Sequence, residues 1–498
     1  MGVFWQQLVA TLLLGLNMGV VQVLATPHEP RDVAVVTLDA PALSLVRRAN
    51  ERILSFTLDS SFIMDRWVDK HMRNEKFLKL ASHLTAAYMR VGGTVSDAML
   101  FKESSSLEGK MSGEDSTRDF ATFYMTGNEW KLINEFVRKA GLKLVFCLNA
   151  LHRTGSAWNP ANAKELLEFS SKQGYSNITF QLGNEPDLFS AMYHQYVTTS
   201  QLATDFASLR SLLDSFPGFR GSALVGPDVF SSDWYLGRFL AAQKAQNHSL
   251  SVVSAHHYYV AGDVAKVTDF YNPTILNTLI SYINEKKALL VNTSTNSPFW
   301  LSETSSAYKG GAANISNKFV DGFMWLDKLA LAAKLGVDVV CRQDIYGNKY
   351  GLLNIDNLDP NPDWWLSVLY KKLVGTGVLN TTLPSGAVRL YAQCSKTSPG
   401  SVLLFGMNLD SQEVQVQLRL GAAGRSAQGK VSAYVLTGES GLLSQTVLLN
   451  GKRLELGANY SLPTLQPVSV EASALRLPAF SLAFLVLEDV QASACKQQ

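Results

Sequence analysis

The stretch Asn177-Ile-Thr-Phe-Gln-Leu-Gly-Asn-Glu-Pro-Asp187 runs from a short apolar strand pattern directly into a polar turn. Pro186 ends the strand, because proline has no N–H to donate to a sheet ladder. Eight apolar runs of strand length alternate with segments whose apolar residues recur at helical spacing. These runs are 53–58, 87–91, 143–148, 178–182, 223–225, 252–255, 299–301 and 337–340.

This alternation between residues 53 and 375 predicts an α/β fold, a (β/α)8 TIM barrel. An open, doubly wound sheet is the alternative, but no glycine-rich phosphate loop follows the first strand to support it. After residue 375, short strand patterns are separated by Gly, Ser, Pro and Asn clusters. We expect a C-terminal antiparallel β-sandwich over 376–498, to which a strand at Val33–Leu38 in the N-terminal segment 26–52 adds.

The first 25 residues predict a signal peptide. An apolar stretch reaches Leu24, Val23-Leu24-Ala25 supplies a small-residue cleavage pattern, and the chain then turns polar. No later stretch is long and apolar enough to span a membrane. We therefore expect a secreted, extracellular protein, with the lysosome as a second destination. Six Asn-x-Ser/Thr sequons agree with this route, because they are used only in a secretory lumen. They lie at Asn177, Asn247, Asn292, Asn314, Asn380 and Asn459.

The net charge excludes one class of function, and the four cysteines predict two free thiols and one candidate disulfide. The 44 Lys and Arg against 42 Asp and Glu give a net charge of +2, which excludes a strongly basic nucleic-acid binder. Doublets such as Lys286-Lys287 and Lys371-Lys372 are expected on solvated faces. Cys147 and Cys341 lie in apolar strand patterns and are expected as buried free thiols. Cys394 and Cys495 remain as candidates for one disulfide.

Two glutamates follow strand patterns in the barrel. Glu185 ends the fourth strand and Glu303, in Pro298-Phe-Trp-Leu-Ser-Glu303, ends the seventh. Active sites of such barrels lie at the carboxyl ends of the strands, so the two side chains can face each other across the mouth. Hydrolysis of a glycosidic bond needs such a pair, one carboxyl to protonate the leaving oxygen and one to attack or activate water. The alternative is that both are solvated turn residues.

Other polar residues end neighbouring strands and should reach the same mouth. They are Asp59 after strand one, Arg90 after strand two, His256-His257-Tyr258-Tyr259 at strand six, and Arg342, Gln343 and Asp344 after strand eight. Arg90 could hold the nucleophile ionised. A metal site on the two histidines is disfavoured, because adjacent strand residues point to opposite faces. No metal and no nucleotide cofactor is implied.

Six motifs together resemble the animal heparanase family, glycoside hydrolase family 79. They are Tyr88-Met-Arg-Val-Gly-Gly-Thr94, Leu182-Gly-Asn-Glu-Pro186, His256-His-Tyr-Tyr259, Glu303-Thr-Ser-Ser-Ala-Tyr308, Gly322-Phe-Met-Trp-Leu-Asp-Lys-Leu329 and Leu477-Pro-Ala-Phe-Ser481. The resemblance covers nearly the whole chain after residue 25. It implies a barrel with a β-sandwich, and a retaining endo-β-glucuronidase that cleaves heparan sulfate or a related uronate-containing glycan.

The resemblance also implies roles for individual residues. Glu185 matches the proton donor and Glu303 the nucleophile, which Arg90 and Tyr258 would support. Tyr308 and the backbone beside it would receive the uronate carboxylate, and Cys394 and Cys495 match a family disulfide. The positions that match the family's sugar-binding cleft are Asp59, Thr94, Asn184, His256, Tyr308, Gly310 and Tyr350.

This chain departs from the family pattern in its charges and in one loop. The linker excised from mammalian members is much shorter here, so we expect a monomeric single chain that begins near Thr26. Acidic and polar residues occupy 114–119 and 230–234, where the family carries basic clusters. Asp263 stands where a basic residue is expected, and Lys309 replaces the first glycine of a Gly-Gly-Gly run. An exo-β-glucuronidase and a non-catalytic glycan-binding relative are therefore alternative functions.

Overall fold

The computed structural model describes residues 23–24, 33–38, 43–104, 120–246, 249–381, 383–384, 386–420, 425–426 and 429–496. The signal peptide expected at residues 1–25 lies outside the described residues except for Val23–Leu24. Most of the polar loop 102–119, including the acidic run at 114–119, and the sequon at Asn247 also lie outside them.

Eight parallel strands form one sheet in the order β11-β8-β5-β4-β17-β15-β13-β12. A parallel bridge between Phe180 and Leu224 joins its two outer strands and closes the barrel. The predicted (β/α)8 barrel is therefore confirmed, and the open sheet is wrong. The strands are β4 (Leu54–Asp59), β5 (Tyr88–Gly92), β8 (Lys143–Leu148), β11 (Thr179–Leu182), β12 (Val225–Val229), β13 (Val252–His257), β15 (Phe299–Thr304) and β17 (Val339–Arg342).

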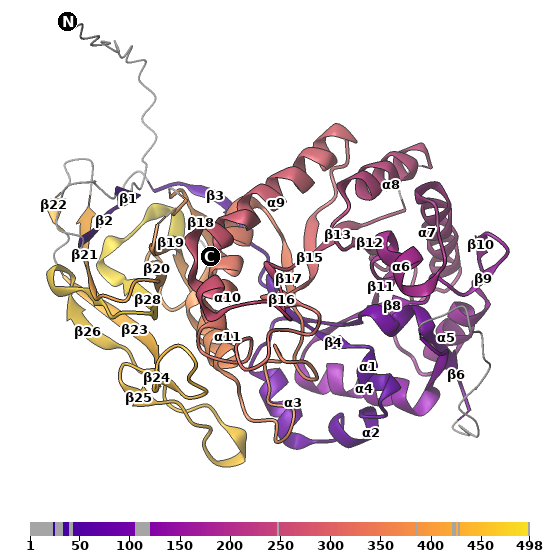
Figure 1. Ribbon diagram of the computed structural model, residues 1–498, viewed down its shortest axis with the longest axis horizontal. Helices are drawn as coiled ribbons and strands as arrows, with labels where there is room; N and C mark the ends of the chain where they lie inside the picture. The colour runs from indigo at the N-terminus through magenta and orange to yellow at the C-terminus, as the bar shows by residue number, and fades with distance from the viewer. Residues whose placement is uncertain are drawn as a thin grey trace, which may run out of the picture.

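Helices surround the barrel (Figure 1). Local signals define their ends. For example, α4 begins with a capping box between Thr126 and Glu129 and ends at Gly141, whose φ of 71° is the left-handed conformation that glycine adopts readily. The main helices are α3 (Glu75–Ser82), α4 (Gly127–Ala140), α5 (Ala161–Lys172), α7 (Thr199–Asp214), α8 (Asp233–Ala245), α9 (Pro273–Asn292), α10 (Asp321–Leu335) and α11 (Pro362–Leu373). Short helices α1 (Ser61–Met64), α2 (Val68–His71) and α6 (Phe189–Tyr193) lie in the connections.

The β-sandwich lies at one end of the molecule, with α10 and α11 at its junction with the barrel (Figure 1). The barrel and the sandwich cover these two helices on opposite sides, and most of their residues are therefore buried. Trp325, Trp364 and Trp365 lie on these helices and pack in the core. One sheet has the order β25-β24-β23-β28-β20-β19-β18-β3, with β26 beside β23. Its strands are β3 (Leu45–Arg48), β18 (Val374–Leu379), β19 (Val388–Ser395), β20 (Val402–Asn408), β23 (Lys430–Gly438), β24 (Val447–Leu449), β25 (Lys452–Arg453), β26 (Val468–Glu471) and β28 (Ser481–Leu487).

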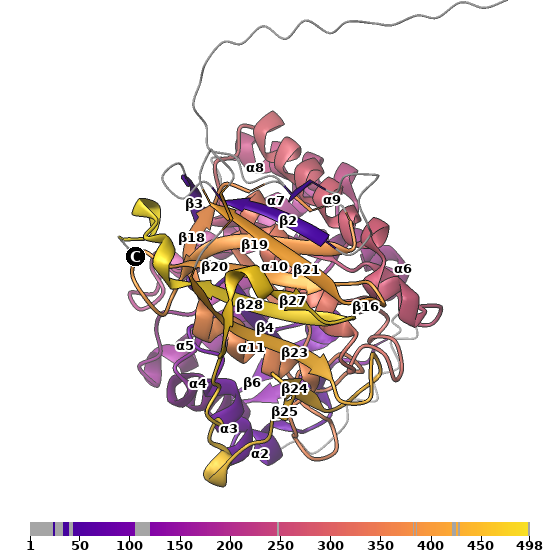
Figure 2. The ribbon, with the colours of Figure 1, turned by 90° about the vertical axis from the view of Figure 1, so that its left-hand side faces the viewer.

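The second sheet contains β1 (Val23–Leu24), β2 (Val33–Leu38), β21 (Val414–Leu420), β22 (Arg425–Ser426) and β27 (Arg476–Leu477). Figure 2 shows β2 beside β21, and this pair is parallel, so the expected sandwich is not antiparallel throughout. No hairpin links β2 to β21, and the direction of β2 is therefore unconstrained by a turn. Both β2 and β3 come from the N-terminal segment, one in each sheet.

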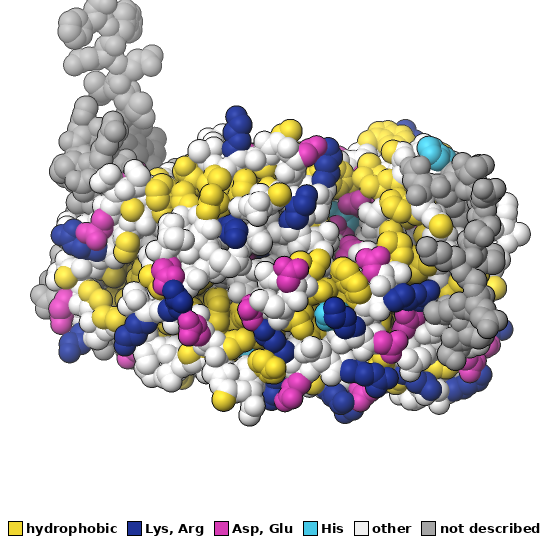
Figure 3. Space-filling model, turned by 60° about the horizontal axis from the view of Figure 1, so that its bottom comes forward, with side chains coloured by type: hydrophobic (Ala, Val, Ile, Leu, Met, Phe, Trp, Pro, Cys, Tyr) yellow, Lys and Arg dark blue, Asp and Glu magenta, His cyan; other side chains and the backbone are white. Residues whose placement is uncertain are grey.

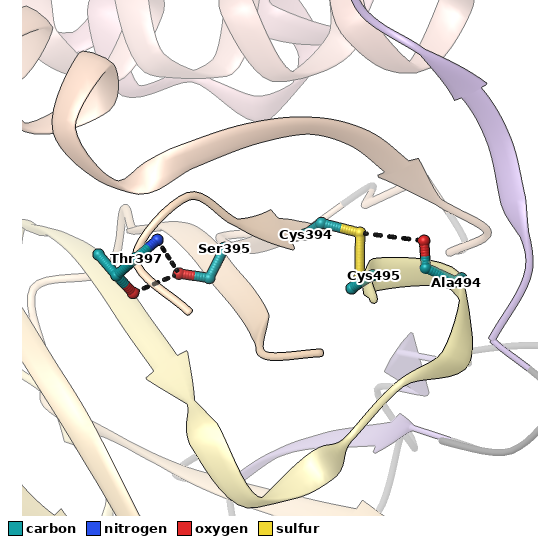
Figure 4. The surroundings of a disulfide bond; sticks show 5 residues. All are labelled: Cys394, Ser395, Thr397, Ala494 and Cys495. Carbon is teal, nitrogen blue, oxygen red and sulfur yellow. Dashed lines mark hydrogen bonds between the residues drawn. A yellow bond between two sulfur atoms is a disulfide. The ribbon is translucent and has the colours of Figure 1, made fainter. Parts of the chain in front are cut away.

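Cys394 on β19 and Cys495 form a disulfide with a Cα–Cα distance of 5.2 Å, which ties the C-terminus to the sandwich (Figure 4). Cys147 and Cys341 are buried free thiols. Both cysteine expectations are thus confirmed. The expectation for the lysine doublets is wrong, because Lys286 and Lys371 are buried and only their neighbours face solvent.

Within the described part of the chain, no helix combines the length and apolar character that a membrane crossing requires. Four of the sequon asparagines are exposed and Asn380 is half-buried, while their glycosylation stays a prediction. The exposed four are Asn177, Asn292, Asn314 and Asn459.

Candidate active site

A cleft of about 420 Å³ opens at the carboxyl ends of the barrel strands. Figure 3 shows a hollow on this side of the molecule, with histidine and acidic side chains at its floor and hydrophobic side chains around it. A larger cavity of about 580 Å³ beside α4 is lined by none of the predicted catalytic residues, so volume alone does not identify the site. The cleft is lined by Asp59, Ser61, Thr94, Val95, Glu185, Leu188, Met192, Phe230, Tyr258, Glu303, Tyr308, Lys309, Gly310, Gln343, Asn348 and Tyr350.

Glu185 and Glu303 meet in this cleft, as the strand count predicts. Glu303 lies in β15, and Glu185 follows β11 in the left-handed conformation, with φ at 53°. The backbone N–H of Glu185 donates a 3.0 Å hydrogen bond to the carbonyl of Asp228, which holds this turn in place. One carboxylate oxygen of each glutamate and the Nδ1 of His256 all lie within 4.8 Å of one another.

Arg90 organises the floor of the cleft. The side chain projects from β5, is fully buried, and donates to Gln181, Asn184, Asp228 and Glu303 over 2.7 to 3.1 Å. A Cβ at Gly92 would lie 2.6 Å from the Arg90 Cζ, so only glycine leaves room for the guanidinium there. Asp228 and Glu303 balance the buried positive charge.

Glu303 has the environment of an ionised carboxylate. Arg90 Nη1 donates to one oxygen at 2.8 Å, and the Tyr258 hydroxyl donates to the other at 2.7 Å. Burial alone would raise the pKa of Glu303, but the charges of His256 and Arg90 and these hydrogen bonds outweigh it and lower the pKa below its ordinary value. A carboxylate that is ionised and held at two oxygens is suited to act as a nucleophile.

Glu185 has the opposite environment. Burial raises its pKa, and the nearby charge of Glu303 adds to the rise, although a 2.9 Å contact with His256 Nδ1 opposes it. Two neighbouring carboxyls whose environments move their pKa values apart are the arrangement that acid and nucleophile roles require.

His256 lies under both carboxylates and is fully buried. Its Nδ1 is 3.9 Å from Glu303, and its Nε2 is 3.8 Å from Asp228, which is an ion-pair contact too long for a hydrogen bond. Burial would lower its pKa, but Glu303, Asp228 and Glu185 outweigh it and raise the pKa to about 10. The ring therefore carries a positive charge beside Glu185.

Asp228 was not singled out from the sequence. It follows Gly226-Pro227 at the end of β12, and its carboxylate accepts from Arg90 and from the hydroxyls of Ser254 and Ser302. Burial would raise its pKa, but Arg90, His256 and Ser254 lower it to about 2. A carboxylate at the end of an apolar strand is the same signal that marks Glu185, so the sequence could have revealed it.

Apart from His256, the proposed sugar-binding residues divide into two groups. Asp59, Thr94, Tyr308, Gly310 and Tyr350 line the cleft directly. Asn184 lies behind the carboxylates, where its Oδ1 accepts from Arg90 and its N–H donates to Asp97 at 2.8 Å. Its buried Nδ2 has no partner among the described residues and remains available as a donor.

Several strand-end residues do not enter the cleft. His257 points away from His256 and packs against Tyr259 and Tyr282, with ring centroids 4.8 Å apart in both cases. Arg342 points outward from the barrel strands to Asp321 and Asp363, in the first turns of α10 and α11. It also donates to the Tyr350 carbonyl at 2.9 Å. Successive residues of a strand face opposite sides, which explains both outcomes.

Gln343 lines the cleft wall, as its place after strand eight predicts, and so does Asn348, which was not singled out from the sequence. Gln343 Nε2 donates to Asp59 Oδ2 at 2.7 Å and fixes that carboxylate. Asn348 Nδ2 donates to Asp344, whose pKa burial raises to about 7. These polar groups offer sugar hydroxyls both donors and acceptors.

The cluster of Glu185, His256 and Glu303 is compact enough to hold a metal ion. Its chemistry fits a metal poorly. His256 is charged, and the guanidinium of Arg90 lies 2.8 Å from Glu303, so a divalent cation would meet two positive charges. The absence of a metal from the reaction stays a prediction.

Comparison with known proteins supports a family assignment. The model of the glycosyl hydrolase family 79 N-terminal domain matches residues 59–330. Heparanase of Gallus gallus is 34% identical over 89% of this chain and 93% of its own length. Hyaluronoglucuronidase of Hirudo nipponia is 32% identical over 94% of this chain and 100% of its own. Inactive heparanase-2 of Homo sapiens, at 28% identity, covers 94% of this chain and 90% of its own.

Among solved structures, a 4-O-α-L-rhamnosyl-β-D-glucuronidase from Fusarium oxysporum superposes with a TM-score of 0.70. It covers 91% of this chain and all of its own, at 18% sequence identity. At that identity, the similarity supports the fold.

Proposed function

Since this chain belongs to glycosyl hydrolase family 79 and is a glycoside hydrolase, we propose that it is a retaining endo-β-glucuronidase that cleaves heparan sulfate or a related glucuronate-containing glycan. The single observation that carries the proposal is the pair of buried carboxyls, Glu185 and Glu303, whose oxygens lie within 4.8 Å of each other at the cleft floor. The names of two relatives, heparanase and hyaluronoglucuronidase, define the range of substrates.

The separation of the carboxyls favours retention. Retaining enzymes hold the two groups about 5 to 5.5 Å apart, whereas inverting enzymes leave about 6.5 to 9.5 Å for a water molecule. One oxygen of Glu185 and one of Glu303 lie within 4.8 Å of each other, and this close approach supports the retaining alternative.

In the first step, ionised Glu303 attacks the anomeric carbon while Glu185 gives its proton to the glycosidic oxygen as the C–O bond breaks. The products are a glycosyl ester on Glu303 and the released alcohol of the leaving glycan. In the second step Glu185, now ionised, takes a proton from water. The resulting hydroxide attacks the anomeric carbon from the face that the leaving glycan has vacated, and it displaces Glu303. Two inversions restore the original configuration.

The surrounding charges suit both steps. Arg90 and Tyr258 keep Glu303 ionised before the attack. When Glu185 loses its proton, the charged His256 ring at 2.9 Å stabilises the new carboxylate. The uronate carboxylate is assigned to Tyr308 and the adjoining backbone at Gly310, with Asp59, Thr94, Asn184 and Tyr350 on the sugar hydroxyls.

Digestion of defined glycans tests the proposal. Heparan sulfate and hyaluronan are incubated with the enzyme, size exclusion follows chain length, and proton NMR follows the anomer that forms first. We expect internal cleavage, an initial β-anomer, and loss of activity in Glu303→Gln. Glu168→Gln on the exposed face of α5 is the matched control. Release of single glucuronates without internal cleavage would support exo action, and an initial α-anomer would refute retention. A wild type that binds these glycans without cleaving them would support a non-catalytic glycan-binding protein.

We also propose that the protein is secreted, without its first 25 residues, and acts as a monomeric single chain. N-terminal sequencing and denaturing electrophoresis of active enzyme purified from medium test this. A second N-terminus within 101–123, with activity only after cleavage, would overturn the single-chain proposal.

A further inference from the structure

Asp263 and Lys309 form an ion pair at the mouth of the cleft. Lys309 Nζ and Asp263 Oδ2 are 2.6 Å apart, and both side chains are more than half exposed, at 59% and 53%. Lys309 belongs to the cleft lining, next to Tyr308 and Gly310. The pair therefore lies where an incoming glycan would first contact the enzyme.

The backbone holds these two side chains at a defined separation. Strands β14 (Val260–Ala261) and β16 (Ala307–Tyr308) pair in parallel just before them. A Cβ at Gly262 would lie 2.5 Å from the Gly311 carbonyl oxygen, so the two loops are in direct backbone contact. Lys309 has a φ of 64°, in the left-handed region that glycine adopts more readily.

Stability does not explain this pair. An ion pair this exposed contributes little to folding, because water screens it and both long side chains lose freedom. A lysine in a left-handed position adds conformational cost. A role in contacting the substrate accounts for a cation at this place.

The charges around the mouth are few and mixed. Among the described residues that line the cleft, Lys309 is the cation and Asp59, Glu185 and Glu303 are the carboxylates. Lys349 lies close by, and its N–H donates to the Gly310 carbonyl at 3.0 Å. Lys309, Lys349 and Asp263 together carry one net positive charge.

We propose that the Asp263–Lys309 pair is a specificity determinant that favours a glycan with one carboxylate per disaccharide and no sulfate. This inference rests on the proposed function and names its substrate class. One carboxylate at the mouth can share Lys309 with Asp263. A sulfated chain brings several more negative charges beside the Asp263 carboxylate, and like charges in such contact repel.

Three substrates of matched length separate sulfate from sugar identity: hyaluronan oligosaccharides, heparan sulfate oligosaccharides, and the same heparan sulfate after chemical desulfation and N-acetylation. Reducing-end release gives kcat and KM for each. We expect wild-type kcat/KM to be at least about tenfold higher for desulfated than for sulfated heparan sulfate. Asp263→Asn should reduce that ratio about fivefold, through a lower KM for the sulfated chain.

The reverse variant and a control complete the test. Lys309→Gly should raise KM for hyaluronan about fivefold and change kcat for hyaluronan less. The reason is that Lys309 contacts the substrate carboxylate already in the bound ground state. Glu413→Gln removes a comparably exposed pair with Arg476 in the sandwich and should leave the ratio unchanged.

An unchanged ratio in Asp263→Asn, or a wild type that prefers the sulfated chain, would overturn this inference and leave the proposed function standing. Failure of the wild type to cleave any of the three substrates would overturn both.

Discussion

Replacing Tyr258 by phenylalanine removes one hydroxyl and tests the assignment of Glu303 as the ionised nucleophile. The Tyr258 hydroxyl donates to Glu303 Oε1 at 2.7 Å and holds its pKa down. A hydrogen bond to a charged group contributes about 1.5 to 3 kcal/mol. One pKa unit corresponds to about 1.4 kcal/mol, so the loss equals about 1 to 2 units.

The lower end of this range applies, because Glu303 keeps Arg90 and His256 as partners and Tyr258 is only half-buried. Since Glu303 must be ionised to attack, the acid limb of kcat/KM should move up by about 1 pH unit. On the plateau, kcat/KM should fall about tenfold, equivalent to about 1.4 kcal/mol.

The assay is a pH profile of kcat/KM on a glucuronate-containing oligosaccharide, with circular dichroism to verify folding. Tyr259→Phe is the matched control, because the Tyr259 hydroxyl is buried and has no hydrogen-bond partner among the described residues. An acid limb that stays in place in folded Tyr258→Phe, or moves equally in Tyr259→Phe, would refute the reasoning.

Three further outcomes are expected. The pH profile of activity should be bell-shaped, because Glu303, whose pKa is lowered, must be ionised, while Glu185, whose pKa burial raises, must be protonated; activity that does not fall at alkaline pH contradicts this. The pKa of Asp228 is lowered from 3.8 to about 2, so its ionised form stabilises the fold above pH 4 by about 2 kcal/mol, and this contribution is lost as the pH falls through 2. In urea titrations, the free energies of unfolding of the wild type and Asp228→Asn should therefore differ by about 2 kcal/mol at pH 7 and converge in acid. Cys394→Ser together with Cys495→Ser should cost about 2 to 5 kcal/mol in thermal unfolding, and an unchanged Tm would exclude a structural role.

Much of the fold follows from local patterns. Seven barrel strands could be located from their apolar runs, because strands buried on both faces are largely apolar, but the run 223–225 shares only Val225 with β12. The strands of the sandwich, which come from both ends of the chain, were harder to locate from the sequence. Strand β3 was not expected, because only Val33–Leu38 was predicted as a sandwich strand in the N-terminal segment. Its pairing depends on a partner far away in the sequence.

The sequence alone determined that Glu185 and Glu303 share one rim, since parallel strands of a barrel all end on the same side. It also determined the disulfide partners and the separation of His256 from His257 onto opposite faces. The first result rests on the topology of the barrel, the second on the place of the other two cysteines in apolar strands, and the third on the two-residue period of a strand.

Only the tertiary structure decided the distances and hydrogen-bond partners of the residues around the two carboxyls. Arg90 contacts Asn184, Asp228 and Glu303 across separations of 94, 138 and 213 residues. The ion pair of Asp263 with Lys309, which spans 46, arises where two loops touch. Charges act over a few ångströms in space and not along the chain, so pKa shifts and partners at the site become readable only when the barrel has closed.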